Sequence, residues 1–560
     1  MKQNLITNTP PDSRARFNYL PKTVYIFLCI IGFTVIIYAN TLNSPFTFDD
    51  FHNITDNQAI QLNRLGPVEI WRAAFQSANP TRPIANISFA LNFYFHQFAL
   101  PGYHVVNILI HALCSCLLYI FLRMTLNLPL LYGKHGSTST DAVSFATAII
   151  WTVHPLNTQS VTYIVQRMNA LAALFVLLTL ICYIQVRLST NRHGRWAWLT
   201  ATFISGCLAL GSKENAATLP FIILLYELYF FQDLDWQWLK KQAQLALGFV
   251  AFFTVLGVIY LQGKPIVMLT ETYAQRDFTL IQRLLTELRV VVYYLELFFF
   301  PHPSRLNLVH DVPLSISLTA PVTTLFSLVF IIGCLSWAIW KADKERLLSF
   351  CVLWYFGNLV IESSVIGLEI IFEHRTYLPS MLVSLLTVIL ITRYLKQKSW
   401  QIALLFIVVL LCSYWTYSRN QVWSDEVTLW TDCMQKSPGL VRPHENLGNA
   451  LDDQGKRQEA TVQYLAALKI NPAADGVHYN LALALYRIGR LSEAKKHFTE
   501  SLRLKPLNPD GVYYLAAIAE QDGNHQLAAQ LYIEVLKLDP NYMNARYRLQ
   551  ILKQKGVFRK

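Results

Sequence analysis

The chain has 560 residues, of which 53% are hydrophobic and only 15% are charged. Soluble proteins usually carry about 25% charged residues, so this composition excludes a protein that is soluble over its whole length. The formal net charge of +12 comes largely from Lys and Arg in short segments between apolar runs. This pattern sets membrane orientation, and we expect no nucleic-acid partner.

Apolar runs dominate residues 1–420 and end near Asn420, whereas residues 421–560 have the composition of an ordinary soluble domain. A membrane-spanning helix needs about 20 mostly apolar residues, and stretches of that kind occur about eleven times. We therefore expect an all-α, polytopic membrane domain over residues 1–420. The expected spans are 23–42, 103–124, 141–158, 168–187, 196–212, 215–232, 242–262, 320–340, 347–361, 377–394 and 400–418.

The first apolar run, from about Val24 to Leu42, has no small-residue cleavage site at its end. We expect a permanent span there and not a removable signal peptide. Lys and Arg gather in the loops on the N-terminal side of the membrane, which indicates a cytoplasmic N-terminus. Segment 284–300 is apolar but carries three charged residues, so we expect an interfacial or re-entrant helix on the outer side.

The first outer loop, 43–102, is the longest and contains two adjacent carboxylates, Asp49 and Asp50, in the run NSPFTFDDFHNITDN. A carboxylate just beyond a span can accept a proton from a hydroxyl group or bind a metal, and apolar surroundings raise its pKa. The alternative is an ordinary solvated turn. No third ligand lies at metal spacing, since His52 is typical of a turn, and we expect no metal.

Further polar residues lie in the outer loops or at the ends of spans. They are Arg82, His154, Arg167, Lys213, Glu214, Glu373, His374 and Arg375. Charges at membrane depth are costly, so they mark a site or pair with one another; the adjacent Lys213 and Glu214 are the best candidates for a local pair. The basic members suit an anionic lipid headgroup, because an arginine donates two hydrogen bonds to a phosphate at once. The predicted phosphate-binding residues are Arg82, Arg167, Lys213 and Arg375.

The C-terminal part has a fixed period. Gly455, Gly489 and Gly523 lie 34 residues apart, and Ala, aromatic and Pro positions keep the same interval. This pattern is typical of the tetratricopeptide repeat, a helix–turn–helix unit that stacks into a solenoid. The expected layout is a linker at 421–440 and an α-solenoid at 441–556, with repeats at 441–474, 475–508 and 509–542 and then a capping helix.

Arrays of this kind usually bind peptides or proteins on a concave face, which the first helix of each repeat forms. Residues there that can hydrogen-bond an extended acceptor peptide are Asn446, Asn449, Asn480 and Tyr514. The alternative is a purely structural cap on the membrane domain.

Several motifs occur in a fixed order along the chain: the FDD pair, the helix beginning RPIANIS, YHVVNILIHAL, HPLNTQSVTYIVQRMNALAALF, KENAATLPFIILLYEL and EHRTYLPS. In this order, and followed by tetratricopeptide repeats, they resemble the transmembrane and tetratricopeptide repeat-containing mannosyltransferases. That family is similar to the protein O-mannosyltransferases with the GT-C fold. The resemblance covers nearly the whole chain.

The resemblance implies a dolichyl-phosphate mannose donor, Ser or Thr hydroxyl acceptors and inversion at the sugar. It makes Asp49 or Asp50 the catalytic acid-base residue, with no metal and no cofactor besides the lipid-phosphate sugar. Gln159 and the Gln166–Arg167 pair depart from the family's acidic residue and Gly-Arg pair. Together with the small number of repeats, this favours a bacterial relative that uses a polyprenyl carrier. Its repeats would then lie in the periplasm, beside the inner membrane.

These observations predict a membrane glycosyltransferase that moves a sugar from a polyprenyl- or dolichyl-phosphate carrier to an acceptor hydroxyl. The expected acceptor is a Ser or Thr of an envelope protein on the extracytoplasmic face. The alternative is a non-catalytic membrane scaffold whose repeats recruit envelope proteins. A transporter is disfavoured, because polar residues gather in the outer loops and not at mid-span positions.

Overall fold

The computed structural model describes residues 13–131, 139–243, 248, 271–274 and 276–554, and every regular element within those ranges is helical. The predicted all-α fold is therefore confirmed. Contacts divide the chain into two units. The first comprises Met1–Leu308 and Val312–Ser424, and the second Val309–Asp311 and Asp425–Lys560.

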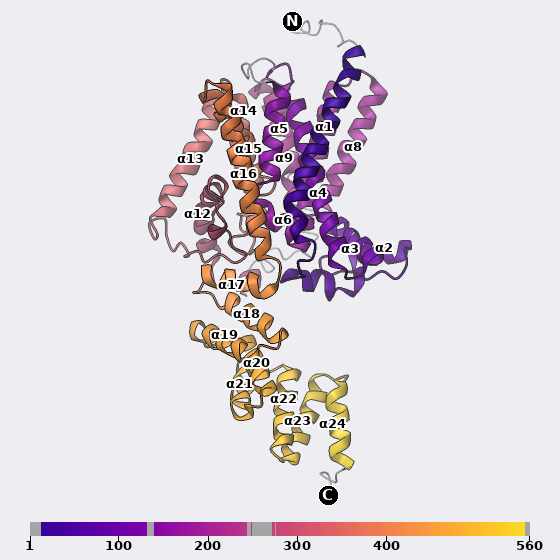
Figure 1. Cartoon of the computed structure of the whole chain (residues 1–560), viewed down its shortest axis with the longest axis vertical. Helices are drawn as coiled ribbons and strands as arrows, with labels where there is room; N and C mark the ends of the chain where they lie inside the picture. The colour runs from indigo at the N-terminus through magenta and orange to yellow at the C-terminus, as the bar shows by residue number, and fades with distance from the viewer. Residues whose placement is uncertain (1–12, 132–138, 244–247, 249–270, 275, 555–560) are drawn as a thin grey trace. The chain divides into compact units, whose positions relative to one another are not determined.

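The first unit is a bundle built around α4, which packs against α1, α5 and α7. Figure 1 shows α2 and α3 lying across one end of this bundle. Its helices are α1 (Ser13–Tyr38), α2 (Pro67–Phe75), α3 (Pro83–His96), α4 (Leu100–Leu126), α5 (Thr140–Thr152), α6 (Thr158–Thr162), α7 (Arg167–Leu188), α8 (Arg192–Leu210), α9 (Leu219–Phe230), α12 (Leu280–Phe299), α13 (Thr323–Lys341), α14 (Arg346–Leu359), α15 (Ser380–Tyr394) and α16 (Lys398–Val422).

Among the described residues, five helical segments are long and apolar enough to cross a bilayer. They are Lys22–Thr41, Leu100–Leu126, Ile164–Leu188, Thr323–Lys341 and Lys398–Val422. The chain is therefore a membrane protein, while the number of about eleven spans and their orientation stay predictions. The expected span at 242–262 lies largely outside the described residues.

Apolar side chains cover the outside of this unit as well as its core. Ile36 and Phe203 are each 72% exposed, and Trp340 is 74% exposed. Such surfaces suit contact with lipid, because large apolar patches are uncommon on monomeric proteins that face water. The core holds Trp151 and Trp354, and their indole N–H groups donate to the carbonyl oxygens of Tyr377 (3.1 Å) and Leu378 (3.0 Å).

Two expected segments take a more detailed form. The helix expected over 141–158 ends at Thr152, because the residue before Pro155 is pushed out of helical conformation, and a short helical turn follows. The expected segment 284–300 forms the larger part of α12 and runs one residue past its end at Phe299; the helix begins with a capping box formed by Thr279 and Gln282.

The second unit contains the repeats, with small residues where its helices meet. Gly455, Gly489 and Gly523 have φ of +78°, +82° and +76°, a left-handed conformation that glycine adopts without strain. A Cβ at Gly448 would lie 2.5 Å from the Tyr464 ring, so only glycine fits there. The helices are α17 (Glu426–Lys436), α18 (Val441–Asp453), α19 (Arg457–Ile470), α20 (Asp475–Arg487), α21 (Leu491–Leu504), α22 (Pro509–Gln521), α23 (His525–Leu538) and α24 (Met543–Gln554).

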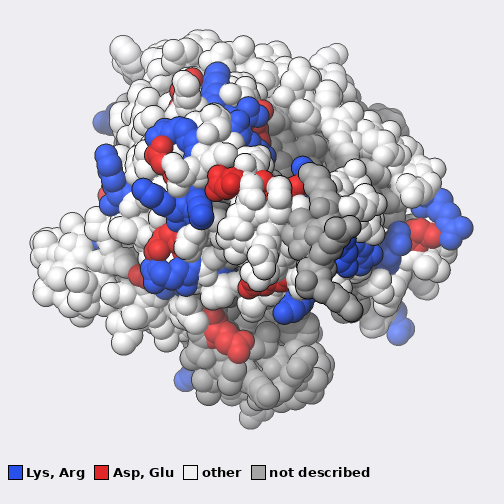
Figure 2. Space-filling view, turned by 90° about the horizontal axis from the view of Figure 1, so that it is seen from below, with Lys and Arg blue, Asp and Glu red and all other residues white. Residues whose placement is uncertain are grey.

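The second unit thus contains the predicted tetratricopeptide repeats, each a pair of packed helices: α18 with α19, α20 with α21, and α22 with α23. On the face of the molecule in Figure 2, Lys and Arg side chains lie among Asp and Glu side chains. Neither sign of charge forms a separate large patch on that face.

Candidate active site

The two adjacent aspartates have different surroundings. Asp50 is fully buried, and its carboxylate oxygens accept hydrogen bonds from the backbone amides of Val165 (2.7 Å) and Thr47 (3.0 Å). Burial raises the pKa of Asp50 well above its usual value, although both amides act in the opposite direction. Its oxygens are therefore used inside the protein, where they join the first outer loop to the start of α7.

Asp49 is only half-buried, so its carboxyl group is the more accessible of the two. The Tyr163 hydroxyl accepts a hydrogen bond from the Asp49 amide (2.8 Å) and also interacts with the Asp49 side chain. Phe48, just before it, has a φ of +50°, which is uncommon for a residue with a side chain. Asp49 and Asp50 therefore occupy different environments although they are adjacent in the chain.

Arg167 is fully buried beside this loop and serves as a hub for neutral acceptors. It donates to Asn107 Oδ1 (2.6 Å), Asn92 Oδ1 (2.7 Å) and the Tyr103 carbonyl (2.9 Å). Its guanidinium group also lies over the Phe89 ring, 4.7 Å from the ring centre. This arrangement links α3, α4 and α7. It also uses most of the N–H donors of Arg167, which was predicted to bind phosphate.

A run of asparagine side chains leads from the aspartate loop to Arg82. Asn53 Nδ2 donates to the Asp49 carbonyl (2.7 Å), and Asn79 Nδ2 donates to Asn53 Oδ1. The Asn79 carbonyl in turn accepts from the Arg82 amide (3.1 Å). Arg82 directly precedes α3, as predicted, and these bonds place it in the same part of the molecule as Asp49.

Lys213 and Glu214 do not pair with each other, so the alternative of a local pair between them is wrong. Glu214 pairs with Arg82 at 2.9 Å, and Lys213 pairs with Glu362 at 2.9 Å. The physical reason is local: Lys213 has φ −159° and ψ 144°, an extended backbone in which successive side chains point to opposite sides.

Lys213 lies at the centre of a buried polar group. Its ammonium also donates to Asn169 Oδ1 (3.2 Å), and Asn169 Nδ2 donates to the His374 carbonyl (2.7 Å). Burial lowers the pKa of Lys213, although Glu362 acts in the opposite direction. Burial also lowers the pKa of His374 well below its usual value, and the nearby charges of Lys213, Arg375 and Arg82 add to this effect. His374 is therefore neutral among three cations.

Three other predicted residues lie deeper in the fold. Arg375 is buried and donates to the carbonyls of Glu369 (2.6 Å) and Ile370 (2.9 Å). Glu373 accepts from the Asn307 amide (2.5 Å). His154 Nε2 lies 3.0 Å from the Phe298 carbonyl, and its ring stacks on the Phe298 ring.

The structure thus brings Arg82, Lys213, Glu214, His374 and Arg375 into one neighbourhood, and Asp49, Asp50 and Arg167 into another. His154 contacts α12, and the short helical turn that it caps packs against the turn that carries His374 and Arg375. Arg82 connects the two neighbourhoods, because its Nη1 contacts the sulfur of Met168 (3.1 Å), the residue after Arg167. The roles predicted for all these residues stay predictions.

The residues predicted to bind acceptor peptide lie on the first helices of the repeats. Tyr464 Oη donates to Asn449 Oδ1 (2.8 Å), and Asn480 Nδ2 donates to Glu445 (3.4 Å). The Nδ2 group of Asn446 is buried with no hydrogen-bond partner among the described residues. Tyr514 stacks on Phe498, with ring centres 5.3 Å apart.

Sequence reasoning missed Tyr163, Asn169 and Arg283. Tyr163 and Asn169 contact site residues through the fold, and nothing in their own segments marks them. Arg283 did leave a signal, since it stands four residues before Glu287 in an apolar stretch, and such a spacing pairs two charges on one helix face.

The fold and site together define a helical membrane protein with a loop carboxylate, a nearby group of cations and a C-terminal tetratricopeptide array. Models of the tetratricopeptide repeat family match residues 448–489 and 479–542. A solved structure, "First TPR of Spaghetti (RPAP3) bound to HSP90 peptide SRMEEVD", is 23% identical and covers 20% of this chain and 91% of its own, with a TM-score of 0.20.

Curated relatives match most of the chain. It is 23% identical over 467 residues to Protein O-mannosyl-transferase F38B6.6 of Caenorhabditis elegans, covering 80% of this chain and 63% of that protein. It is 25% identical over 534 residues to Protein O-mannosyl-transferase Tmtc3 of Drosophila melanogaster, covering 83% and 57%. For Protein O-mannosyl-transferase TMTC3 of Homo sapiens, identity is 22% and coverage 79% and 51%.

The chain is therefore a relative of the proteins named protein O-mannosyl-transferases, and the resemblance carried by its motifs is confirmed. It spans between 51% and 63% of the length of these three relatives. A bacterial origin stays a prediction.

Proposed function

We propose that this protein is an integral membrane glycosyltransferase that moves a sugar from a polyprenyl- or dolichyl-phosphate carrier to a Ser or Thr hydroxyl of a protein. The observation that carries the proposal is the half-buried Asp49. Hydrogen bonds through Asn53 and Asn79 connect it to Arg82, which with Lys213 and Arg375 forms the cation group. A general base beside a phosphate-binding group is what transfer from a lipid phosphate requires. The names of the relatives support the same activity.

In the proposed reaction, the Asp49 carboxylate accepts the proton of the acceptor hydroxyl. The acceptor oxygen forms a bond to C1 of the sugar as the bond from C1 to the phosphate oxygen breaks, and the electron pair leaves with the lipid phosphate. The configuration at C1 of the sugar is thereby inverted. Tyr163 holds Asp49 in place, and Asp50 anchors the loop from inside, which assigns the base to Asp49.

The cations would stabilise the charge that develops on the leaving phosphate. Arg82 is the most accessible of them, since its side chain is 26% exposed against 10% for Lys213. Arg82 therefore contacts the phosphate directly in this proposal, while Lys213 and Arg375 contribute positive charge from behind it. Positioning and charge neutralisation supply most of the barrier reduction, because a lipid phosphate is already a good leaving group.

We also propose that the reaction takes place on the extracytoplasmic face and that the repeats present the acceptor protein. Mass spectrometry of membrane and secreted glycoproteins tests the proposal, with cells that carry the wild-type protein, none, or the Asp49→Asn variant. Hexose on Ser or Thr should be present only with the wild-type protein. If the Asn variant restores the modification fully, Asp49 is not the base. If the modification never depends on the protein, the scaffold alternative is favoured.

A further inference from the structure

Residues 360–372, between α14 and a short helical turn at Glu373–Thr376, form no helix or strand. A buried irregular segment must satisfy its carbonyl groups in another way. Here a single fully buried arginine, Arg283 of α12, binds four of these carbonyl groups. Its hydrogen bonds are Nε to the Ser364 carbonyl (3.2 Å), Nη1 to those of Leu368 (2.6 Å) and Glu369 (3.0 Å), and Nη2 to that of Glu362 (2.6 Å).

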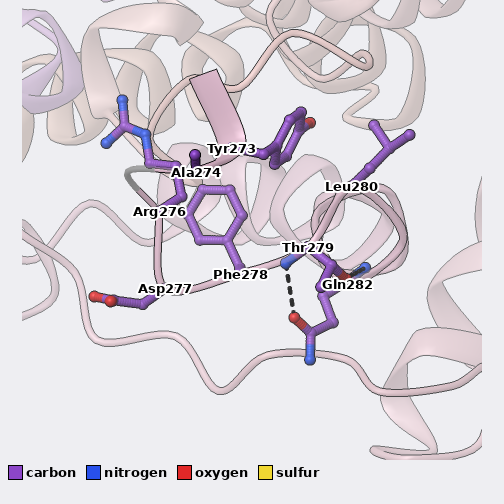
Figure 3. A pocket seen from close by; sticks show the side chains of 8 residues that line it. All are labelled: Tyr273, Ala274, Arg276, Asp277, Phe278, Thr279, Leu280 and Gln282. Carbon is purple, nitrogen blue, oxygen red and sulfur yellow. Dashed lines mark hydrogen bonds between the residues drawn. The ribbon is translucent and has the colours of Figure 1, made fainter. Parts of the chain in front are cut away.

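Other side chains of the same region bind further carbonyls. Arg375 binds two of them, Arg276 Nε donates to the Gly367 carbonyl (3.1 Å) and Tyr273 Oη to that of Val365 (2.8 Å). Arg276 and Tyr273 also line a pocket of about 640 Å³ at the start of α12. Figure 3 shows these side chains around the pocket, with Phe278 between Arg276 and Leu280.

The charges of this region form a continuous series that leads to the cation group. Arg283 pairs with Glu287 at 2.9 Å, and Glu287 lies 3.8 Å from Arg375. Burial raises the pKa of Glu287 to about 7, although Arg375 and Arg283 act in the opposite direction. Arg283 therefore has a charge partner on its own helix and also binds the backbone of the loop that carries Glu362.

We infer that Arg283 is a positioning residue for the donor site. By binding the carbonyls of Glu362, Ser364, Leu368 and Glu369 it holds the Glu362 carboxylate against Lys213, and so fixes where this ammonium group places its positive charge behind the donor phosphate. The inference rests on the proposed function. It follows from the order of contacts, since Arg283 touches the backbone of Glu362 and the side chain of Glu362 touches Lys213 (2.9 Å).

The test compares Arg283→Lys with Arg289→Lys. Lysine keeps the charge but cannot span four carbonyls, because its donors lie on one atom. Arg289 lies on the same helix and, within the part of the chain that the structure describes, binds a single carbonyl, that of Pro313 (2.7 Å), which makes it the matched control. The purified full chain, in liposomes with polyprenyl-phosphate mannose and a Ser/Thr peptide, is assayed for the KM of each substrate.

Arg283→Lys should raise the donor KM about tenfold, the effect of losing one hydrogen bond to a charged group, and leave the peptide KM unchanged. Arg289→Lys should match the wild type. A donor KM that stays at the wild-type value in Arg283→Lys, or a peptide KM that rises equally, overturns the inference. If the wild-type protein transfers neither mannose nor another hexose from its polyprenyl phosphate, the proposed function fails and the inference fails with it.

A double-mutant cycle with Glu362→Gln separates positioning from general support of the fold. If Arg283 acts through Glu362, the double variant should have the donor KM of Glu362→Gln alone; multiplied effects would overturn the inference. If Arg283→Lys does not accumulate, Glu287→Gln takes its place in the test. This variant removes the charge partner of Arg283 and leaves the contacts of Arg283 with the carbonyls possible. It should raise the donor KM and speed amide exchange in residues 362–370. No change in either measurement would count equally against the inference.

Discussion

The two aspartates should respond differently to the same substitution. Asp49→Asn removes the proposed base but keeps the shape of the side chain. General-base catalysis typically contributes about 10²- to 10⁴-fold to the rate, so transfer should fall by that factor. Asp49 is half-buried, and asparagine keeps both the backbone hydrogen bond to Tyr163 and a side-chain oxygen that can interact with the Tyr163 hydroxyl, so thermal unfolding of the purified protein should change little.

Asp50→Asn should act mainly on stability. The buried carboxylate accepts from two backbone amides, and an asparagine can offer only one oxygen while its NH₂ group faces the other amide. A buried N–H left without an acceptor costs about 1–3 kcal/mol. The variant should therefore unfold at a lower temperature and lose transfer in proportion to the folded protein that remains.

The assay measures mannose transfer from polyprenyl-phosphate mannose to a Ser/Thr peptide under single-turnover conditions, alongside thermal unfolding in detergent. Rates are expressed per folded molecule. A rate for Asp49→Asn within a few-fold of the wild type would refute the assignment of the base. A folded and stable Asp50→Asn protein with no transfer would exchange the roles of the two residues.

Further predictions concern the cations, the metal, the repeats and pH. Arg82→Gln should raise the donor KM about tenfold, whereas Arg64→Gln, at a side chain that is 79% exposed and pairs with Glu69 in the same loop, should not; equal effects would remove Arg82 from the donor site. Transfer should survive EDTA, and a loss that Mg²⁺ or Mn²⁺ restores would establish a metal site. Truncation after Ser424 should leave a membrane protein that still uses a short peptide at high concentration but no longer modifies native acceptors; failure of this protein to accumulate would show that the repeats are structural. The Nδ1 atoms of His497 and His478 lie 3.0 Å apart. Burial, His478 and Lys496 lower the pKa of His497, although Glu493 and Glu500 act in the opposite direction. The folded state then binds fewer protons than the unfolded state, so amide protection of α20 and α21 should fall as pH drops below about 6.5, and His497→Gln, which copies Gln463 of the first repeat, should reduce this dependence.

The repeats could be predicted from the sequence because their contacts are local and periodic. Gly455 and its equivalents recur at a fixed interval, and each repeat packs chiefly on its neighbours. The helical membrane unit could also be predicted, because its long apolar runs are visible in the sequence. Helix ends were harder, as the early end of α5 at Thr152 shows.

The ion pairs of the site could not be predicted, because they depend on how distant segments meet. Lys213 is adjacent to Glu214 in sequence but pairs with Glu362, and Glu214 pairs with Arg82. Sequence did identify three of these four residues, Arg82, Lys213 and Glu214, as members of one outer group. It could not show that Asp50 is buried, since Asp49 and Asp50 share a motif and differ only in where the fold turns them.

The most direct test of the central claim uses the purified full chain in liposomes with radiolabelled polyprenyl-phosphate mannose and a Ser/Thr-rich acceptor protein. Our account predicts that label moves to the protein, is released by β-elimination and is absent with Asp49→Asn. Retention of all label on the lipid, with the wild-type protein folded and the acceptor bound to its repeats, would contradict the account and favour a scaffold.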